Sequence, residues 1–164
     1  MQRAIKILDS KHYPYEALSN KHYRNVFVLG LGSNTAKSNT SSVDILESTF
    51  KWLYNNPKIH ILCTSPILRN PPFGYTRQND FYNAIMLCES NMPIRDIYTL
   101  MFYIERRFAR RRKRDFKNAP RTLDVDLICF NALRLNLGHL QLPHRFYTQR
   151  VSVMLPLSFI DEIY

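Results

Sequence analysis

The chain has 164 residues, 45% of them hydrophobic and 22% charged, a composition that excludes overall disorder and suits one folded domain. No apolar run approaches the 18 residues of a membrane span, and the N-terminus lacks the apolar core of a secretory signal. A formal charge of +10 indicates an anionic partner: nucleic acid, nucleotide phosphate or an acidic surface.

The N-terminal quarter of the chain predicts an extension, a strand and a turn. Residues 1–24 are basic and aromatic, and we expect them to extend a single domain at 25–164 by adding an edge strand or packing as a tail. The apolar run 26–29 predicts a central strand. We expect it to stop at 30–34, where two glycines permit a tight turn and a close backbone approach.

A helix, a strand and a long loop follow. Ser41 or Ser42 can cap a helix whose apolar positions keep helical spacing up to its end at Asn55. Residues 59–68 predict a second strand. The loop at 70–80 is long for a compact domain, and such loops are usually functional.

The second half of the chain predicts a third strand at 81–88 and a helix that begins after Pro93. Strands are expected at 122–130 and, as a short terminal element, near 151–155. The order β-α-β-β-α-β with an extra terminal strand predicts an α+β, ferredoxin-like fold, in which helices pack on one face of an antiparallel sheet.

The three cysteines, Cys63, Cys88 and Cys129, stand far apart in apolar runs. An odd number without a C-x-x-C pair argues against a disulfide scaffold or a zinc site. We expect small buried hydrophobic side chains on strands, in a cytoplasmic protein that stays reduced.

Two carboxylates in the strand at 122–130 are the strongest local feature. Alternation places Asp124 and Asp126 on one face, roughly 6–7 Å apart at their backbones, and the apolar residues between them on the other. Such a pair can converge on a divalent cation, or simply face solvent. The nearby Arg121 favours the metal site over the solvated edge.

A run of cations precedes that strand, beginning on the last turns of the second predicted helix. Part of it suits a helix C-terminus, but the number exceeds what capping needs and indicates a phosphate site. The cations are Arg106, Arg107, Arg110, Arg111, Arg112, Lys113, Arg114 and Lys117.

Three smaller patterns add to this. Phe81 and Asn83 share a strand face, where a ring beside an amide suits a flat heterocycle such as a pterin or nucleobase, although core packing explains them as well. His144 becomes a plausible phosphate contact beside an acidic metal site. The two glycines at 30–34 match neither a dinucleotide-binding nor a P-loop motif.

An ordered set of motifs from about residue 26 to 157 carries a family resemblance. The motifs are Gly32-Ser33-Asn34, Pro71-Pro72-Phe73-Gly74, Asp80-Phe81-Tyr82-Asn83-Ala84, Glu105 ahead of Arg110, Pro120-Arg121-Thr122-Leu123-Asp124-Val125-Asp126, and Pro143-His144 with Arg150 and Pro156-Leu157. Together they resemble the 6-hydroxymethyl-7,8-dihydropterin pyrophosphokinase family of folate biosynthesis.

The resemblance implies a reaction and a set of site residues. ATP transfers an intact pyrophosphoryl group to the hydroxymethyl oxygen of the dihydropterin, leaving AMP, with two Mg²⁺ ions held by Asp124 and Asp126. The implied catalytic residues are Arg110, Arg121 and Asp126, of which Asp126 is our candidate acceptor for the hydroxyl proton. The implied ATP site comprises Glu105, Arg112, Lys113, His144 and Arg150. The implied pterin site comprises Asn70, Pro71, Phe73, Phe81 and Asn83.

We expect a monomer that binds its two small substrates and neither nucleic acid nor a membrane. Two alternatives remain at this point. The basic charge and the predicted sheet also fit an RNA-binding module, which would need no metal. A relative that kept the fold without the activity is the other, because Ala109 and Ser152 stand where the family usually has glycine and an aromatic ring.

Overall fold

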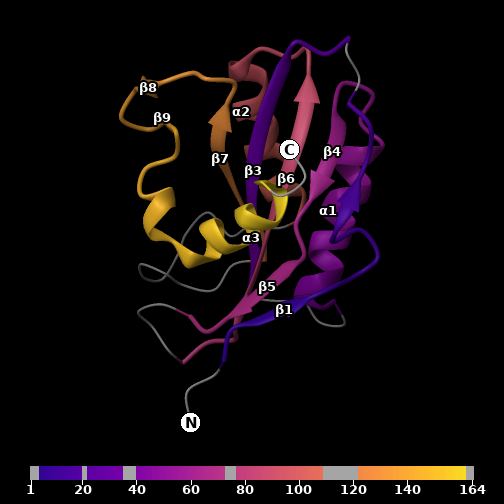
Figure 1. Ribbon diagram of the computed structural model, residues 1–164, viewed down its shortest axis with the longest axis vertical. Coiled ribbons are helices and arrows are strands. Elements are labelled where there is room, and N and C mark those ends of the chain that lie inside the picture. The colour runs from indigo at the N-terminus through magenta and orange to yellow at the C-terminus, as the bar shows by residue number, and fades with distance from the viewer. Residues whose placement is uncertain (1–3, 20–21, 35–39, 73–76, 109–121, 162–164) are drawn as a thin grey trace.

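The computed structural model describes residues 4–19, 22–34, 40–72, 77–108 and 122–161. Its central elements are β3 (Asn25–Ser33), α1 (Ser42–Tyr54), β4 (His60–Thr64), β5 (Ile67–Asn70), β6 (Phe81–Ser90), α2 (Ile94–Arg107) and β7 (Asp124–Phe130). Strand β6 lies between β3 and β4, and β3 lies between β6 and β7, with all neighbours antiparallel. This arrangement confirms the predicted α+β, ferredoxin-like fold (Figure 1).

The predicted turn at 30–34 is wrong, because β3 continues through both glycines to Ser33. Neither Gly30 nor Gly32 has a positive φ. What these positions need is space: a Cβ at Gly30 would lie 3.1 Å from Ile128 Cδ1, and one at Gly32 would lie 2.9 Å from Asn83 Oδ1. The expected close approach is therefore present, but the side chains of Ile128 and Asn83 approach the backbone of a strand and not that of a turn.

The predicted single strand at 59–68 is two strands. The chain leaves the ladder at Ser65 and Pro66, because proline has no N–H to donate in the middle of a sheet. Ser65 bridges the break, since its N–H donates to the Ile85 carbonyl and its Oγ accepts from the Ile85 N–H, each at 2.9 Å. β4 then pairs with the C-terminal half of β6 and β5 with the N-terminal half.

Helices α1 and α2 begin and end where the sequence predicts. Ser41 accepts the Asp44 N–H while Asp44 accepts the Ser41 N–H, forming a capping box at the start of α1. Pro93 is the N-cap of α2. Both helices pack on one face of the sheet over the main apolar core, which includes Leu46 and Ile104 at 0% exposure.

The predicted terminal strand near 151–155 is wrong. Residues there form α3 (Val151–Asp161), which continues through Pro156. The apolar residues Val153, Leu157 and Ile160 recur at helical spacing and pack on the face of the sheet opposite α1 and α2. Helices therefore cover both faces, with α3 in front of the sheet in Figure 1, and not one face as expected.

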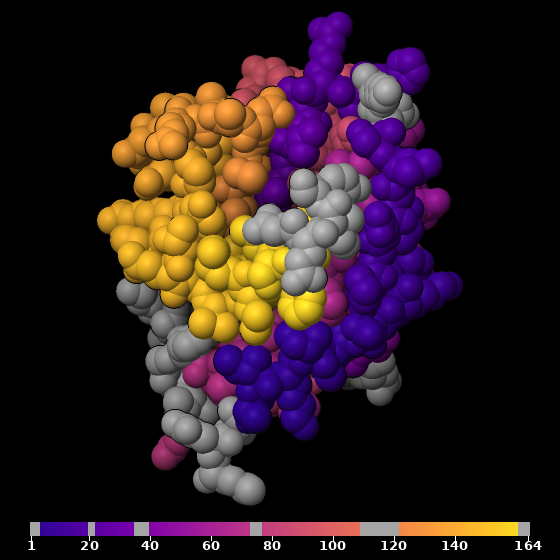
Figure 2. Space-filling view, in the orientation of Figure 1, coloured from indigo at the N-terminus to yellow at the C-terminus, as the bar shows by residue number. Residues whose placement is uncertain are grey.

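The N-terminal residues add two edge strands. β1 (Lys6–Leu8) pairs with β5, and β2 (Tyr15–Glu16) pairs with β4. Between them Tyr13 is fully buried, and its hydroxyl donates to the Leu46 carbonyl at 2.8 Å. Figure 2 shows this indigo segment spread over one flank of the molecule. The segment is thus built into the main core.

Glu47 on α1 anchors this N-terminal segment. Its carboxylate accepts hydrogen bonds from Ser10 Oγ and from the His12 N–H, and it lies 2.6 Å from His12 Nδ1. Partial burial raises the pKa of the Glu47 carboxyl, but the hydrogen bonds from Ser10 and His12 outweigh it, so its pKa lies below the ordinary value.

The cysteines lie on strands as predicted, on β4, β6 and β7, and all three are free. Burial raises the pKa of the Cys63 thiol to about 12 and raises that of Cys88 further.

Within the described residues, no helix is both long and apolar enough to cross a membrane.

The remaining elements connect β7 to α3. A small hairpin of β8 (Leu135–Asn136) and β9 (Gln141–Leu142) is followed by a short 3-10 helix, η1 (Tyr147–Gln149). The peptide bond between Leu142 and Pro143 is cis. This connection brings His144 and Arg150 beside β7.

Candidate active site

The two aspartates of β7 lie on one face, as the sequence predicts. Asp124 and Asp126 are half-buried, whereas Val125 and Leu127 between and beyond them are buried in the core under α1 and α2. The acids therefore face the side of the sheet away from these two helices. Two carboxylates on one strand face repel each other unless cations lie close.

A histidine and an arginine stand beside Asp126. We call Asp124, Asp126, His144 and Arg150 the acidic edge. His144 Nε2 and Arg150 Nη1 each lie 3.8 Å from a different Asp126 oxygen. At this distance they interact as charges without forming short hydrogen bonds, and the His144 interaction is ionic only when the imidazole is protonated. The His144 N–H donates to the Ile128 carbonyl at 2.7 Å, which fixes its backbone against β7.

Glu105 supports this edge from behind. Its side chain on α2 is 3% exposed, and Oε1 accepts the Val125 N–H at 2.9 Å. That N–H lies between the two aspartates in sequence. Glu105 therefore ties the beginning of β7 to α2.

A second set of polar side chains lies at the ends of β5 and β6, and we call Asn70, Phe81 and Asn83 the amide wall. Asn83 Nδ2 donates to Asn70 Oδ1 at 2.7 Å, and Asn70 Nδ2 donates to the Pro71 carbonyl at 3.0 Å. Asn70 is 2% exposed, while Phe81 and Asn83 are half-buried. The amides thus hold one another in a fixed orientation.

Gly32 joins the two sets. In the sheet register it pairs with Asp124 of β7 on one side and with Asn83 of β6 on the other. Directly paired residues of antiparallel strands share a face, so Asp124, Gly32 and Asn83 form a row across three strands. With two strand spacings between them, the backbones of Asp124 and Asn83 are roughly 10 Å apart. Gly32 has no side chain of its own, and the Asn83 amide oxygen lies over it, 2.9 Å from where a Cβ would stand.

Several predicted site residues lie outside the described residues: Arg110, Arg112, Lys113, Arg121 and Phe73. The others fall into the two sets, with Asp124, Asp126, His144 and Arg150 at the acidic edge, Glu105 behind it, and Asn70, Phe81 and Asn83 in the amide wall. Pro71 follows β5 directly and is half-buried.

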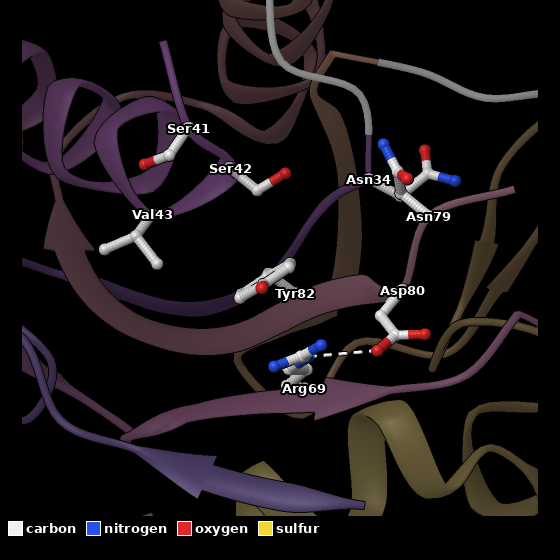
Figure 3. Close-up of a pocket in the computed structure, with 8 residues that line it drawn as sticks. All are labelled: Asn34, Ser41, Ser42, Val43, Arg69, Asn79, Asp80 and Tyr82. Carbon is white, nitrogen blue, oxygen red and sulfur yellow. Dashed lines mark hydrogen bonds and ion pairs between the residues drawn. The ribbon is translucent and has the colours of Figure 1, made fainter. Parts of the chain in front are cut away.

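On the opposite face of the sheet lies a cavity of about 410 Å³ that sequence reasoning did not anticipate (Figure 3). It is lined by Asn34, Ser41, Ser42, Val43, Arg69, Asn79, Asp80 and Tyr82. Beside it, Asn34 Nδ2 donates to Gln78 Oε1 at 2.8 Å, and both side chains are buried. Arg69 was not singled out, and Asp80 and Asn34 entered only as family motifs. The sequence signal for these residues is that a charged or polar side chain stands at the end of an apolar strand in each case.

Comparison with known proteins identifies the family of the chain. Residues 28–162 match the model of the 7,8-dihydro-6-hydroxymethylpterin-pyrophosphokinase family. The chain belongs to this pyrophosphokinase family. The match covers every described residue of the acidic edge and the amide wall, and the family's use of ATP agrees with a site where cations flank acids.

Named relatives cover nearly the whole chain. A Helicobacter pylori 2-amino-4-hydroxy-6-hydroxymethyldihydropteridine pyrophosphokinase is 45% identical over 153 residues, which is 93% of this chain and 91% of the relative. The enzyme of that name from Campylobacter jejuni is 37% identical over 92% of both chains. One from Methylorubrum extorquens is 30% identical over 80% of both. These relatives are therefore similar to this chain over 80% or more of their own length.

Proposed function

We propose an arrangement of residues for the reaction of this chain, which transfers pyrophosphate from ATP to 6-hydroxymethyl-7,8-dihydropterin, giving the pterin pyrophosphate and AMP, as a step of folate biosynthesis. The row of Asp124, Gly32 and Asn83 is the observation that carries it. A flat heterocycle at the amide wall would reach the acidic edge with its hydroxymethyl arm across Gly32, which adds no side chain of its own to this row.

The acidic edge fits Mg²⁺. Asp124 and Asp126 offer hard carboxylate oxygens on one face, and their partners on β3, Gly32 and Gly30, add no side chain of their own beside them. Mg²⁺ is usually held by one or two carboxylates, with phosphate oxygens and water as its other ligands. Two bound Mg²⁺ ions would neutralise the triphosphate.

Three side chains of this protein have proposed roles in the reaction itself. Asp126 is the proposed acceptor of the hydroxyl proton, and Arg110 and Arg121 are the proposed stabilisers of charge on the transferring group. The pterin hydroxyl oxygen attacks the β-phosphorus, and the bond from that phosphorus to the α-phosphate oxygen breaks to release AMP.

The remaining residues bind the two substrates. His144 and Arg150 present donors beside Asp126, and with Glu105, Arg112 and Lys113 they form the proposed ATP site. Their net positive charge suits a nucleotide triphosphate. The amide wall with Pro71 and Phe73 forms the proposed pterin site, where Phe81 offers a ring for stacking and the amides offer donors and acceptors at the ring edge.

The proposal also covers the setting of the enzyme. Residues 25–164 form the pyrophosphokinase domain, and residues 1–24 extend it. The protein acts as a monomer in the cytoplasm and binds neither nucleic acid nor a membrane. Cys63 and Cys88 are buried, Cys129 is half-buried where the sequence predicts a buried side chain, and all three are free, which supports a reducing compartment.

Magnesium-dependent nucleotide binding tests the arrangement. The dissociation constant of a non-hydrolysable ATP analogue is measured by calorimetry with and without Mg²⁺ in the wild-type protein, Asp126→Asn and a control, Asp96→Asn, whose exposed carboxylate lies at the start of α2. The wild type and the control should bind at least about tenfold more weakly without Mg²⁺, and Asp126→Asn should lose most of that difference.

Two outcomes would contradict the proposal. Nucleotide affinity that ignores Mg²⁺, together with RNA binding that falls steeply with salt, would favour the RNA-binding alternative. An Asp126→Asn variant that binds the nucleotide with Mg²⁺ normally and keeps full turnover would remove Asp126 as the proton acceptor.

A further inference from the structure

A charged pair joins the two ends of the loop that separates β5 from β6. Arg69 Nε lies 2.9 Å from Asp80 Oδ2, and the two residues are 11 positions apart (Figure 3). The Asp80 side chain is 5% exposed, whereas that of Arg69 is 40% exposed. Burying a carboxylate this deeply costs free energy, and a cation within hydrogen-bond distance offsets part of that cost.

The pair lies directly behind the amide wall. In the ladder of β5 with β6, Arg69 pairs with Tyr82 and Asn70 pairs with Phe81. Successive side chains of a strand point to opposite faces. Arg69, Asp80 and Tyr82 therefore face the cavity on the helical side, while the neighbouring residues Asn70 and Phe81 face the proposed pterin site.

The ladder at this point is short and ends at the site. β5 pairs with β6 through three residue pairs, and the last of them is Asn70 with Phe81. Ends of short ladders fray readily. Asp80 is the residue just beyond that last pair. Its ion pair with Arg69 therefore holds the ends of β5 and β6 together on the face opposite Asn70. The Arg69 guanidinium also lies 5.9 Å from the centre of the Tyr82 ring, which keeps it over β6.

We propose that Arg69 and Asp80 are positioning residues for the pterin substrate: their ion pair holds the last rung of β5 and β6, and through it the orientation of Asn70 toward Asn83. The pair touches neither substrate. The inference rests on the proposed assignment of the amide wall to the pterin. It predicts an effect on pterin binding that is separate from ATP binding.

Steady-state kinetics with ATP, Mg²⁺ and 6-hydroxymethyl-7,8-dihydropterin test this in Asp80→Asn, Arg69→Gln and the double variant. We expect the KM for the pterin to rise about tenfold, with the KM for ATP and kcat within about threefold of wild type. Because the two residues act as one pair, the double variant should be no worse than either single variant. Arg69→Lys, which keeps the charge, should recover most of the loss.

Controls separate positioning from general loss of structure. Arg95→Gln removes one member of an exposed pair, Arg95 with Asp96 at 3.6 Å on α2, and should leave both KM values unchanged. If Asp80→Asn fails to fold, the half-exposed Arg69→Gln decides the question alone. An unchanged KM for the pterin, an equal rise in both KM values, or additive effects in the double variant would overturn the inference.

Asn83→Ala distinguishes this inference from the proposed function. A raised pterin KM in Asn83→Ala with none in Arg69→Gln would overturn the positioning role and leave the amide wall in place. An unchanged pterin KM in both variants would remove the amide wall itself from the pterin site, and the positioning role with it.

Discussion

The acidic edge and the amide wall lie on the same sheet face but are built in opposite ways. In the amide wall the partners are close: Asn83 donates to Asn70 at 2.7 Å, and Asn70 is 2% exposed. At the acidic edge His144 and Arg150 each stand 3.8 Å from an oxygen of Asp126, and both aspartates are half-buried. The amide wall is held by short hydrogen bonds between its own amides, whereas the acidic edge is half-exposed and holds His144 and Arg150 at longer range.

The difference follows from what each set is proposed to bind. A flat neutral heterocycle is recognised by donors and acceptors at fixed positions, so a wall held by its own hydrogen bonds loses little freedom on binding. A triphosphate arrives with metal ions, so acids that stay open to solvent can accept them. Changes at the two sets should therefore have different signatures in activity and stability.

The largest expected effect is at the acidic edge. Asp124→Asn should lower kcat by about 10³-fold, since it removes a proposed metal-holding carboxylate. The same change relieves repulsion with Asp126, so the melting temperature without Mg²⁺ should stay equal or rise slightly. Turnover assays and thermal unfolding measure both. A variant with much lower stability and near-normal kcat would reverse the comparison.

A matched pair of glycine variants comes next. A Cβ at Gly32 would lie 2.9 Å from Asn83 Oδ1. That amide cannot turn away without disturbing its hydrogen bond to Asn70, so Gly32→Ala should lower the free energy of unfolding by about 1–3 kcal/mol. A Cβ at Gly30 would meet the flexible tip of Ile128 at 3.1 Å, so Gly30→Ala should stay within about 1 kcal/mol of wild type.

Urea unfolding compares the two glycine variants, and the pterin KM should rise in Gly32→Ala beyond its rise in Gly30→Ala. Equal costs in the two variants would mean that the Asn83 amide yields as easily as the Ile128 side chain, and that the amide wall is not rigid.

The smallest effect on pterin binding is expected at Glu47, which reaches the amide wall only through β1 and β5. β1 pairs with β5, and Glu47 anchors the segment that follows β1. Glu47→Gln should lower the free energy of unfolding by about 1–2 kcal/mol at pH 7, because it weakens hydrogen bonds to a charged acceptor. The pterin KM should change by less than about twofold.

This effect has a defined pH dependence. The pKa of Glu47 is lowered in the folded state, so its contribution is present above its unfolded pKa of about 4.3 and is lost as the pH falls through the folded value. The stability gap between wild type and Glu47→Gln should therefore persist at neutral pH and shrink below about pH 4. A gap that is constant from pH 7 to pH 3 would contradict the role of the charge.

Features that depend on local pattern could be predicted from the sequence. The alternation around Asp124 and Asp126 places both acids on one face, and the caps of α1 and α2 lie where Ser41 and Pro93 indicate. The strand predicted at 151–155 is wrong because a short apolar run fits a strand or a helix equally well. Only its packing on the sheet decides between them.

Contacts across the sheet could not be predicted in this way. Asn70 and Asn83 are 13 residues apart, and their bond depends on the register of β5 with β6. The Arg69 and Asp80 pair depends on the same register, and the row through Gly32 depends on the order of three strands. A single sequence contains no direct signal for register across a long loop.

The most direct test of the whole account is the product of turnover. The full chain is mixed with ATP, Mg²⁺ and 6-hydroxymethyl-7,8-dihydropterin, and the nucleotides and pterins are separated by chromatography. The account predicts AMP and pterin pyrophosphate in equal amounts, formed only when pterin and Mg²⁺ are both present. ADP in place of AMP, or no nucleotide product from folded protein, would contradict it.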